Sequence, residues 1–196
     1  MYRELKAVWN EYTAPGQLFE INTVDVRGVP TRNFALAPPS LREVWQGAAQ
    51  HGEREYLIYQ NERISYAQAQ VTSAAIANWL SQQGVGPGDR VAIAMRNYPE
   101  WMLAYWAITS MGAVVVGMNA WWVAQEMEYA LTDSEPKVLI CDRERLGRFE
   151  EIRENFPELV VVAVRLDQEV PADVIDWKDV VLAEAVLPEG TIDSDS

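Results

Sequence analysis

One stretch of the sequence decides the fold: residues 84–142, which read GVGPGDRVAIAMRNYPEWMLAYWAITSMGAVVVGMNAWWVAQEMEYALTDSEPKVLICD. Apolar runs rich in β-branched residues at 90–95, 113–116 and 137–141 predict buried strands. Helical patterns separate these runs, at 99–111 and 124–132. Strands that alternate with helices indicate a parallel sheet. The sequence therefore predicts an α/β fold, an open and mostly parallel sheet with helices on both faces.

The flanking segments continue this pattern. The run LVVVAV at 159–164 predicts a fourth strand, and an amphipathic helix is expected before it at 143–156. Upstream, we expect a helix at 67–83 that Gly84 ends, preceded by a hairpin within 56–65. A further helix is expected over 40–51. Its inward side should carry Leu41, Val44, Trp45 and Ala48.

The N-terminal segment is less regular. Residues 4–13 fit a short helix and residues 19–24 alternate like a strand, but the glycine and prolines within 28–39 are typical of irregular chain wrapped over a surface. We therefore divide the chain into an N-terminal helix and wrap at 1–39, an α/β subdomain at 40–190, and a linker or truncation edge at 191–196.

A membrane-spanning helix is the main competing interpretation of the central stretch. No charged side chain occurs at 101–125, and about 20 apolar residues span a bilayer. However, Gly112 and Gly117 interrupt the run, and three consecutive valines at 114–116 favour a strand. We expect a core helix followed by a core strand, and no transmembrane segment.

Composition excludes several classes of partner. The 196 residues carry a net charge of −13, which argues against binding to nucleic acids or to an anionic membrane. Cys141 is the only cysteine and lies in an apolar run, so we expect a buried thiol and no internal disulfide. No apolar secretory segment follows the charges near the N-terminus, and we expect a cytoplasmic protein.

The residue types that commonly carry catalysis are poorly represented. His51 is the only histidine and falls near an expected helix end, so neither a histidine triad nor a histidine metal site can be built. The glycine-rich loop at 84–88 precedes a strand, whereas phosphate cradles use the N-terminus of a helix. We assign no catalytic residue and no metal ligand.

Three arginines, Arg143, Arg145 and Arg148, follow an expected parallel strand, at the sheet edge where α/β folds bind ligands. Two interpretations are open. Helix ion pairs are favoured, because Glu144 and Arg148 are four residues apart and Glu150 and Arg153 are three apart. The alternative is a phosphate or other anion held by Arg145 and Arg148.

Two tryptophans, Trp121 and Trp122, also leave alternatives open. They are large enough to line a pocket wall, but packing in the core is the favoured interpretation.

Several motifs, taken in order, carry a family resemblance. They are ISYAQ at 64–68, GVGPGDRVAI at 84–93, NYPEW at 97–101, GAVVVGMN at 112–119 and SEPKVLI at 134–140. Together they resemble the N-terminal subdomain of the adenylate-forming (AMP-binding) superfamily, close to the fatty-acid and other acyl-CoA synthetases. The chain departs from the usual family pattern at Gln68-Ala69 and at Met118.

The resemblance implies part of an ATP-dependent carboxylic acid:CoA ligase that forms an acyl-adenylate and then an acyl-CoA thioester. The intact enzyme would use ATP, Mg²⁺ and CoA in fatty acid metabolism. The family's Ser/Thr/Gly-rich phosphate loop ending in Pro-Lys-Gly does not occur in this chain, nor do its later catalytic segments. We therefore expect the chain alone to be inactive and to bind none of these cofactors tightly.

The resemblance also implies site residues and partners. Arg145 and Arg148 become candidates for holding a CoA phosphate, and Trp121 and Trp122 for bordering the acyl pocket or an interface. The expected partners are the downstream subdomains of the same chain and a fatty or other carboxylic acid, with a homodimer left open. The alternative function is a non-catalytic, acidic α/β interaction module, which should be monodisperse alone.

Overall fold

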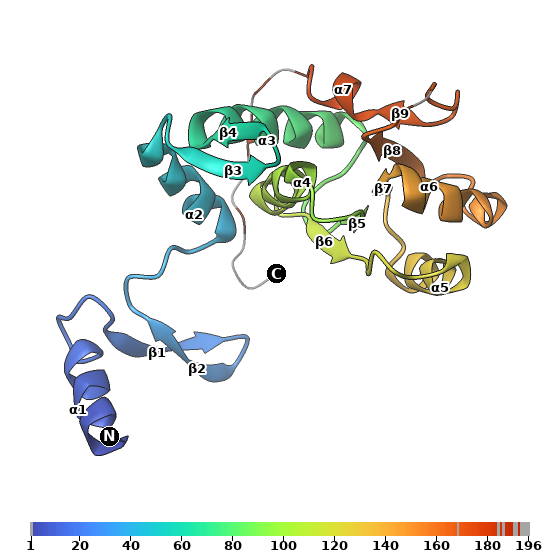
Figure 1. Cartoon of the computed structure of the whole chain (residues 1–196). Helices are drawn as coiled ribbons and strands as arrows, with labels where there is room; N and C mark the ends of the chain where they lie inside the picture. Colours follow the sequence, from blue (N-terminus) through green and yellow to red (C-terminus); the bar gives the residue numbers. More distant parts are fainter. Residues whose placement is uncertain (1, 168, 184, 186, 190–191, 193–196) are drawn as a thin grey trace. The chain divides into compact units, whose positions relative to one another are not determined.

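The computed structural model describes residues 2–167, 169–183, 185, 187–189 and 192 (Figure 1). The chain folds as two compact units, one up to Ser40 and one from Leu41 to Ile192. Apart from Ile192, the expected linker at 191–196 lies outside the described residues.

The first unit contains helix α1 (Tyr2–Tyr12) and an antiparallel hairpin of β1 (Ile21–Val26) and β2 (Val29–Phe34). The expectation of irregular chain after residue 28 is therefore wrong for β2. Arg27 and Gly28 both adopt positive φ, 51° and 82°, which is the geometry of a tight two-residue hairpin turn. Pro30 is tolerated because each strand of a two-stranded sheet is an edge strand.

The second unit is built on a five-stranded parallel sheet. In spatial order its strands are β6 (Val114–Gly117), β5 (Arg90–Ala94), β7 (Val138–Asp142), β8 (Val160–Val164) and β9 (Ile175–Asp176). Every neighbouring pair runs parallel, and the four predicted strands are confirmed within one residue at each end. The two-residue strand β9 was not predicted.

The remaining elements of this unit surround the sheet. The helices are α2 (Leu41–Gly47), α3 (Tyr66–Gln82), α4 (Pro99–Ser110), α5 (Ala124–Ser134), α6 (Arg143–Glu150) and α7 (Trp177–Val180). Short 3-10 turns occupy Ala48–His51 and Arg153–Asn155. The predicted hairpin is confirmed as β3 (Glu55–Tyr59) and β4 (Glu62–Ser65).

Alternate residues of the strands point to opposite faces of the sheet and build two cores. On one face, Val91 and Ile140 pack with Ile76 of α3, within a core that also takes residues from α2, α4 and α7. On the other face, Ala92 and Cys141 pack in a core with residues of α5 and α6. Helices cover both faces, so the predicted fold class is confirmed (Figure 1).

Two helix predictions need correction. In α2, Trp45 is buried, whereas Leu41 and Val44 are exposed, because one buried indole stacked on Trp106 at 4.7 Å fills the space beneath this short helix. The helix predicted at 143–156 ends at Glu150, and a 3-10 turn follows it.

The uncharged central run forms most of α4, all of β6 and the loop after it, as expected. Within the part of the chain that the structure describes, no helix is both long and apolar enough to cross a bilayer.

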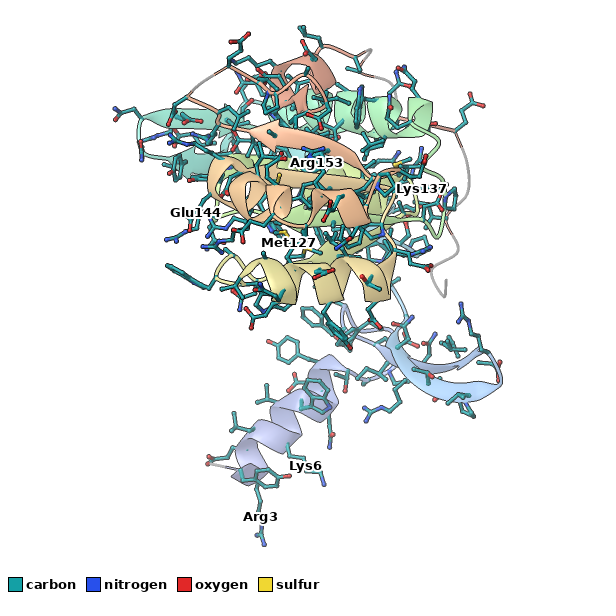
Figure 2. All side chains as sticks on the ribbon, turned by 90° about the vertical axis from the view of Figure 1, so that its right-hand side faces the viewer. Arg3, Lys6, Met127, Lys137, Glu144 and Arg153 are labelled. Carbon is teal, nitrogen blue, oxygen red and sulfur yellow. The ribbon has the colours of Figure 1, made fainter. Side chains whose placement is uncertain are left out.

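The chain changes face between two neighbouring strands, β5 and β7. The helix after β5 (α4) contributes to the first core, whereas the helix after β7 (α6) contributes to the second. A crevice is expected at the carboxyl ends of such a pair of strands. In Figure 2 this edge is marked by Glu144, just after β7, and the opposite edge by Lys137, just before it.

Candidate functional site

The carboxyl edge of the sheet holds two neighbouring grooves. The first has a volume of ≈ 570 Å³ and is lined by residues that follow β5 and β6, with Tyr59 and Glu144 at its sides. The second, of ≈ 500 Å³, is lined by residues that follow β7 and β8. Tyr98 and Glu144 line both grooves, so the two grooves adjoin at these side chains. The carboxyl edge is therefore hollowed near the ends of β5 and β7, where the change of face predicts a crevice.

Asp142 is the buried centre of this edge. It is the last residue of β7, and its carboxylate caps α6 by accepting the backbone N–H of Arg145 at 3.0 Å. The same carboxylate accepts the backbone N–H of Arg96, at the end of β5, at 2.9 Å. With only 3% of its surface exposed, Asp142 ties the ends of two neighbouring strands together.

Arg145 is buried beside this carboxylate, with 1% of its surface exposed. Its Nη1 bonds to Asp142 at 3.1 Å and to Glu144 at 2.9 Å. Its Nε donates to the backbone oxygen of Ala120 at 2.8 Å, and Nη2 donates to the same oxygen. Every nitrogen of the guanidinium therefore has a protein partner.

Arg148 braces the same loop from the next turn of α6. Its Nη1 donates to the backbone oxygens of Ala120 and Trp122, at 3.0 and 2.5 Å, and its Nη2 pairs with Glu144 at 2.5 Å. The two helix ion pairs favoured from the sequence, Glu144 with Arg148 and Glu150 with Arg153, are both present. A phosphate contact by Arg145 or Arg148 stays a prediction.

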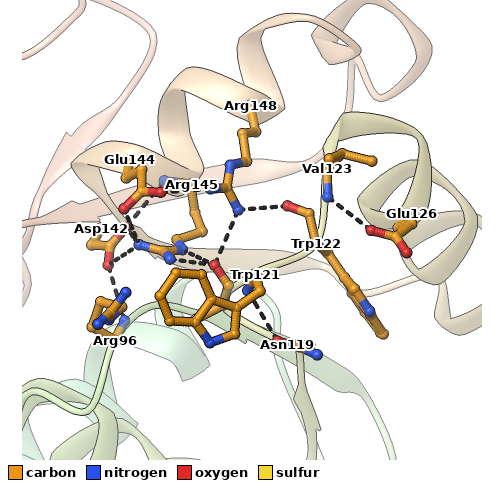
Figure 3. Close-up of polar contacts among 11 residues, drawn as sticks. Arg96, Asn119, Trp121, Trp122, Val123, Glu126, Asp142, Glu144, Arg145 and Arg148 are labelled. Atoms are coloured by element: carbon orange, nitrogen blue, oxygen red, sulfur yellow. Dashed lines mark hydrogen bonds and ion pairs between the residues drawn. The ribbon is translucent and has the colours of Figure 1, made fainter.

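Figure 3 shows the braced loop, residues 119–122, with its two tryptophans, and one of these is exposed to solvent. The Trp121 side chain is 69% exposed, and the guanidinium of Arg96 lies over its ring, 4.4 Å from the centroid. Trp122 instead packs against the second core. The favoured interpretation of core packing is therefore wrong for Trp121, because two arginines hold the loop in a conformation that directs its ring outward.

A second cluster at this edge, around Arg165, was not anticipated. Arg165 follows β8 with a φ of 54° and binds Glu62 of the hairpin through two hydrogen bonds of 2.8 Å. It also bonds to Glu100 at 3.0 Å, and its guanidinium lies 4.9 Å from the rings of Tyr59 and Tyr98. This cluster fastens the hairpin to the rim of the grooves.

These contacts shift two pKa values. The hydrogen bonds from Arg165 hold the pKa of Glu62 below its ordinary value. Partial burial, and next the nearby carboxylate of Asp142, raise the pKa of Tyr98, so its hydroxyl stays protonated at neutral pH. Elsewhere, burial raises the pKa of the Cys141 thiol, which is inert in the core as expected.

Sequence reasoning missed Arg96, Tyr98 and Arg165 as residues of one site. A signal was available, because Arg96 and Arg165 each follow a predicted strand, as the singled-out Arg143 does. The lone His51 lies away from this edge. Its ring packs on the ring of Tyr66, with 4.7 Å between the centroids.

Comparison with known proteins decides the family. A family model described as AMP-binding enzyme matches residues 44–193, more than half of the chain. The chain belongs to the AMP-binding enzyme family. This confirms the resemblance that the motifs carry.

The curated relatives of this AMP-binding chain are CoA ligases. The crotonobetaine/carnitine–CoA ligase of Salmonella paratyphi A is 26% identical over 140 residues, which are 68% of this chain and 27% of that enzyme. A medium/long-chain-fatty-acid–CoA/3-oxocholest-4-en-26-oate–CoA ligase of Mycobacterium marinum is 30% identical over 115 residues, 59% of this chain and 21% of that enzyme. The chain thus spans about a quarter of the length of these relatives.

Solved structures agree on the fold of this family member. An anthranilate CoA ligase in complex with anthranoyl-AMP superposes with a TM-score of 0.74 at 22% identity, over 80% of this chain and 31% of that one. Acetoacetyl-CoA synthetase from Streptomyces lividans gives a TM-score of 0.71 at 24% identity, over 97% of this chain and 33% of that one.

Proposed function

We propose that this chain is the N-terminal part of an ATP-dependent carboxylic acid–CoA ligase. In the proposed reaction the acid and ATP give an acyl-adenylate and pyrophosphate, and CoA then displaces AMP to give the thioester. The observation that carries the proposal is the AMP-binding family match over residues 44–193, together with relatives whose activity is CoA ligation.

The chain's own residues do not fit the triphosphate of ATP. The 196-residue sequence contains no Ser/Thr/Gly-rich loop ending in Pro-Lys-Gly, and the glycine-rich turn at 84–88 leads into β5 rather than into a helix. We therefore assign ATP, Mg²⁺ and the adenylation chemistry to the rest of the proposed enzyme. The chain alone is expected to be inactive and to bind no cofactor tightly.

We assign the anionic end of CoA to the carboxyl edge. Arg148 keeps 22% of its side chain exposed, and both it and the buried Arg145 bind the backbone oxygen of Ala120, a residue that lines the first groove. In the proposed enzyme Arg148 contacts a CoA phosphate, while Arg145 acts through the loop that it holds. When bound, CoA supplies the thiol that accepts the acyl group.

A fatty acid is the proposed substrate, since the relative at 30% identity acts on medium- and long-chain fatty acids. The carnitine-type acids named for the other relatives are the second candidates. Trp121 and Trp122 are the candidates from this chain for bordering the acyl pocket or an interface with the rest of the enzyme.

The test uses the polypeptide that includes the coding region downstream of residue 196. Acid-dependent exchange of pyrophosphate into ATP is measured with fatty acids of graded chain length and with carnitine. We expect exchange with medium- or long-chain fatty acids. Failure of every acid to support exchange would contradict the proposal.

Arg148→Ala in the same polypeptide tests the CoA assignment. Because Arg148 is proposed to act only in the second step, the variant should raise the KM for CoA about tenfold, the worth of one charged hydrogen bond, and leave pyrophosphate exchange unchanged. Arg153→Ala, which removes a helix ion pair on the same segment, is the control and should change neither quantity.

A further inference from the structure

One edge of the parallel sheet is open. β6 is the outermost strand at this edge, and among the residues that the structure describes it pairs with β5 alone (Figure 1). Edge strands are commonly protected by a charged side chain, a proline or a bulge. β6 has none of these: it reads Val-Val-Val-Gly, its pairing with β5 is regular, and no charged residue occurs at 101–125. The edge therefore offers an uncharged row of backbone groups to a further strand.

The composition of β6 is that of an interior strand. Central strands of parallel sheets are continuous apolar runs buried on both faces, and β7 and β8 have this form. β6 is equally apolar but less covered, since Val114 is 45% exposed and Val115 and Val116 are half-buried. Gly117 is exposed, and a glycine in a strand commonly marks a place where another backbone approaches closely. These features indicate that β6 has a second neighbour.

Two residues of β6 direct their backbone polar groups away from the sheet. The N–H groups of Val114 and Met118 donate to backbone oxygens just before and within β5, at 2.8 and 3.0 Å. Because successive residues of a strand alternate, Val116 also faces β5, whereas Val115 and Gly117 face outward. The outward N–H and C=O groups of these two residues are the template for a further strand.

The C-terminal end of the described chain lies beside the start of β6. Arg42 of α2 donates one hydrogen bond of 3.1 Å to the backbone oxygen of Ser110, at the end of α4, and one of 3.0 Å to that of Pro188. Further along the chain, Cγ1 of Ile192 lies 3.5 Å from the place that a Cβ on Gly112 would occupy. Gly112 is two residues before β6. A segment that continues from Ile192 therefore starts at the amino end of β6 and can run parallel to it.

We propose that the open edge of β6 binds an apolar β-strand from the polypeptide that follows Ser196. This strand runs parallel to β6 and forms hydrogen bonds with the outward groups of Val115 and Gly117. Residues 193–196 read DSDS and supply the connection to it. The existence of the downstream polypeptide rests on the proposed function. The position of Ile192 favours this occupant over a second copy of the chain, because consecutive segments usually lie next to each other in a sheet.

Amide hydrogen exchange tests the pairing, followed by NMR on protein labelled with 15N-valine. In the 196-residue chain we expect the Val115 amide to exchange fast, and the amides of Val114 and Val116, which face β5, to exchange slowly. In the polypeptide that includes the downstream coding region, exchange at Val115 should slow by at least about a hundredfold, because an amide bonded within a sheet exchanges only when the sheet opens. Val114 and Val116 are controls in the same strand and should stay slow in both proteins.

A proline variant adds a measurement of stability. Val115→Pro removes the outward N–H and leaves the N–H groups that bind β5. Proline is tolerated in an edge strand where its nitrogen faces solvent, but not inside a sheet. The substitution should therefore lower the Tm of the extended polypeptide by more than that of the 196-residue chain, and equal shifts would contradict the pairing.

The inference is overturned if Val115 exchanges equally fast in both proteins. It is also overturned if Val115 is already protected in the 196-residue chain and this protection grows with concentration, which would show pairing with a second copy. Neither result depends on catalysis. If the extended polypeptide forms thioester while Val115 stays unprotected, the ligase proposal stands and this inference fails, whereas protection of Val115 without thioester gives the reverse.

Discussion

At the scale of single residues, Asp142 connects more parts of the carboxyl edge than any arginine does. Its carboxylate caps a helix, anchors the backbone after β5 and neutralises a guanidinium that is 1% exposed. A buried ion pair adds little net stability compared with apolar residues, but removal of one partner leaves the other buried and uncompensated.

Asp142→Ala should therefore be strongly destabilising. We expect the free energy of unfolding to fall by about 3–5 kcal/mol, measured by urea denaturation. Asp167→Ala breaks the exposed ion pair with Arg143 at the same edge and should cost at most about 1 kcal/mol. Equal losses in the two variants would show that Asp142 does not hold a buried charge.

Glu62 should make stability depend on pH. Its pKa is lowered in the folded protein by Arg165, from an ordinary value of 4.5. As pH falls, the unfolded chain binds the proton first, so the contribution of this pair is present above about pH 4.5 and is lost as pH falls through the lowered folded pKa. Glu62→Gln should thus destabilise at pH 7 and have a smaller effect in acid.

Urea denaturation at pH 7 and at the lowest pH where the chain stays folded measures this difference. Glu53→Gln, an exposed carboxylate with no ion pair among the described residues, is the control. A Glu62→Gln effect that does not shrink in acid would contradict the assignment.

At the scale of elements, α3 begins with a reciprocal cap. The Ser65 hydroxyl accepts the Gln68 N–H at 3.2 Å, and the Gln68 side chain accepts the Ser65 N–H at 2.9 Å. The motif fixes where the hairpin ends and where the helix that covers the first core begins.

Ser65→Ala should lower the free energy of unfolding by about 1 kcal/mol, since it leaves one backbone donor of the first turn without its partner. Ser81→Ala, in the exposed last turn of the same helix, is the matched control and should be neutral or slightly stabilising. Calorimetry compares the two variants, and equal shifts in Tm would exclude a capping role.

Sequence reasoning predicted the elements whose pattern is local. The parallel strands are runs of valine, isoleucine and alanine, so their ends were placed within one residue. It missed β2, because the hairpin turn carries Arg27 where asparagine or aspartate is usual. It missed β9, because two residues are too few to show a period.

The candidate site was less predictable than the fold. The sequence placed Arg145 just after a strand but did not show that its side chain is buried. Its burial depends on Asp142 and on a backbone oxygen 25 residues away. The exposure of Trp121 has the same origin. The predicted strand order pointed to the sheet edge, but only tertiary contacts distinguish the buried Arg145 from the exposed Arg96.

At the scale of the whole molecule, both cores belong to the second unit. Every core residue lies at or after Trp45, whereas no described residue of the first unit is buried. One helix and a two-stranded hairpin do not form an independently stable core. We therefore expect the second unit to fold without the first.

Removal of residues 1–40 should leave the unfolding transition of the remaining chain within a few degrees of its original Tm. Thermal unfolding followed by circular dichroism compares the two chains. Loss of cooperative unfolding in the shortened chain would show that the second unit depends on the first.

The most direct test of the whole account is formation of acyl-CoA by the polypeptide that includes the downstream coding region, with the 196-residue chain assayed beside it. We predict thioester that requires ATP, CoA and a fatty acid together in the longer polypeptide, and none from the 196-residue chain. No thioester from the longer polypeptide with any carboxylic acid, or thioester from the 196-residue chain alone, would contradict the account.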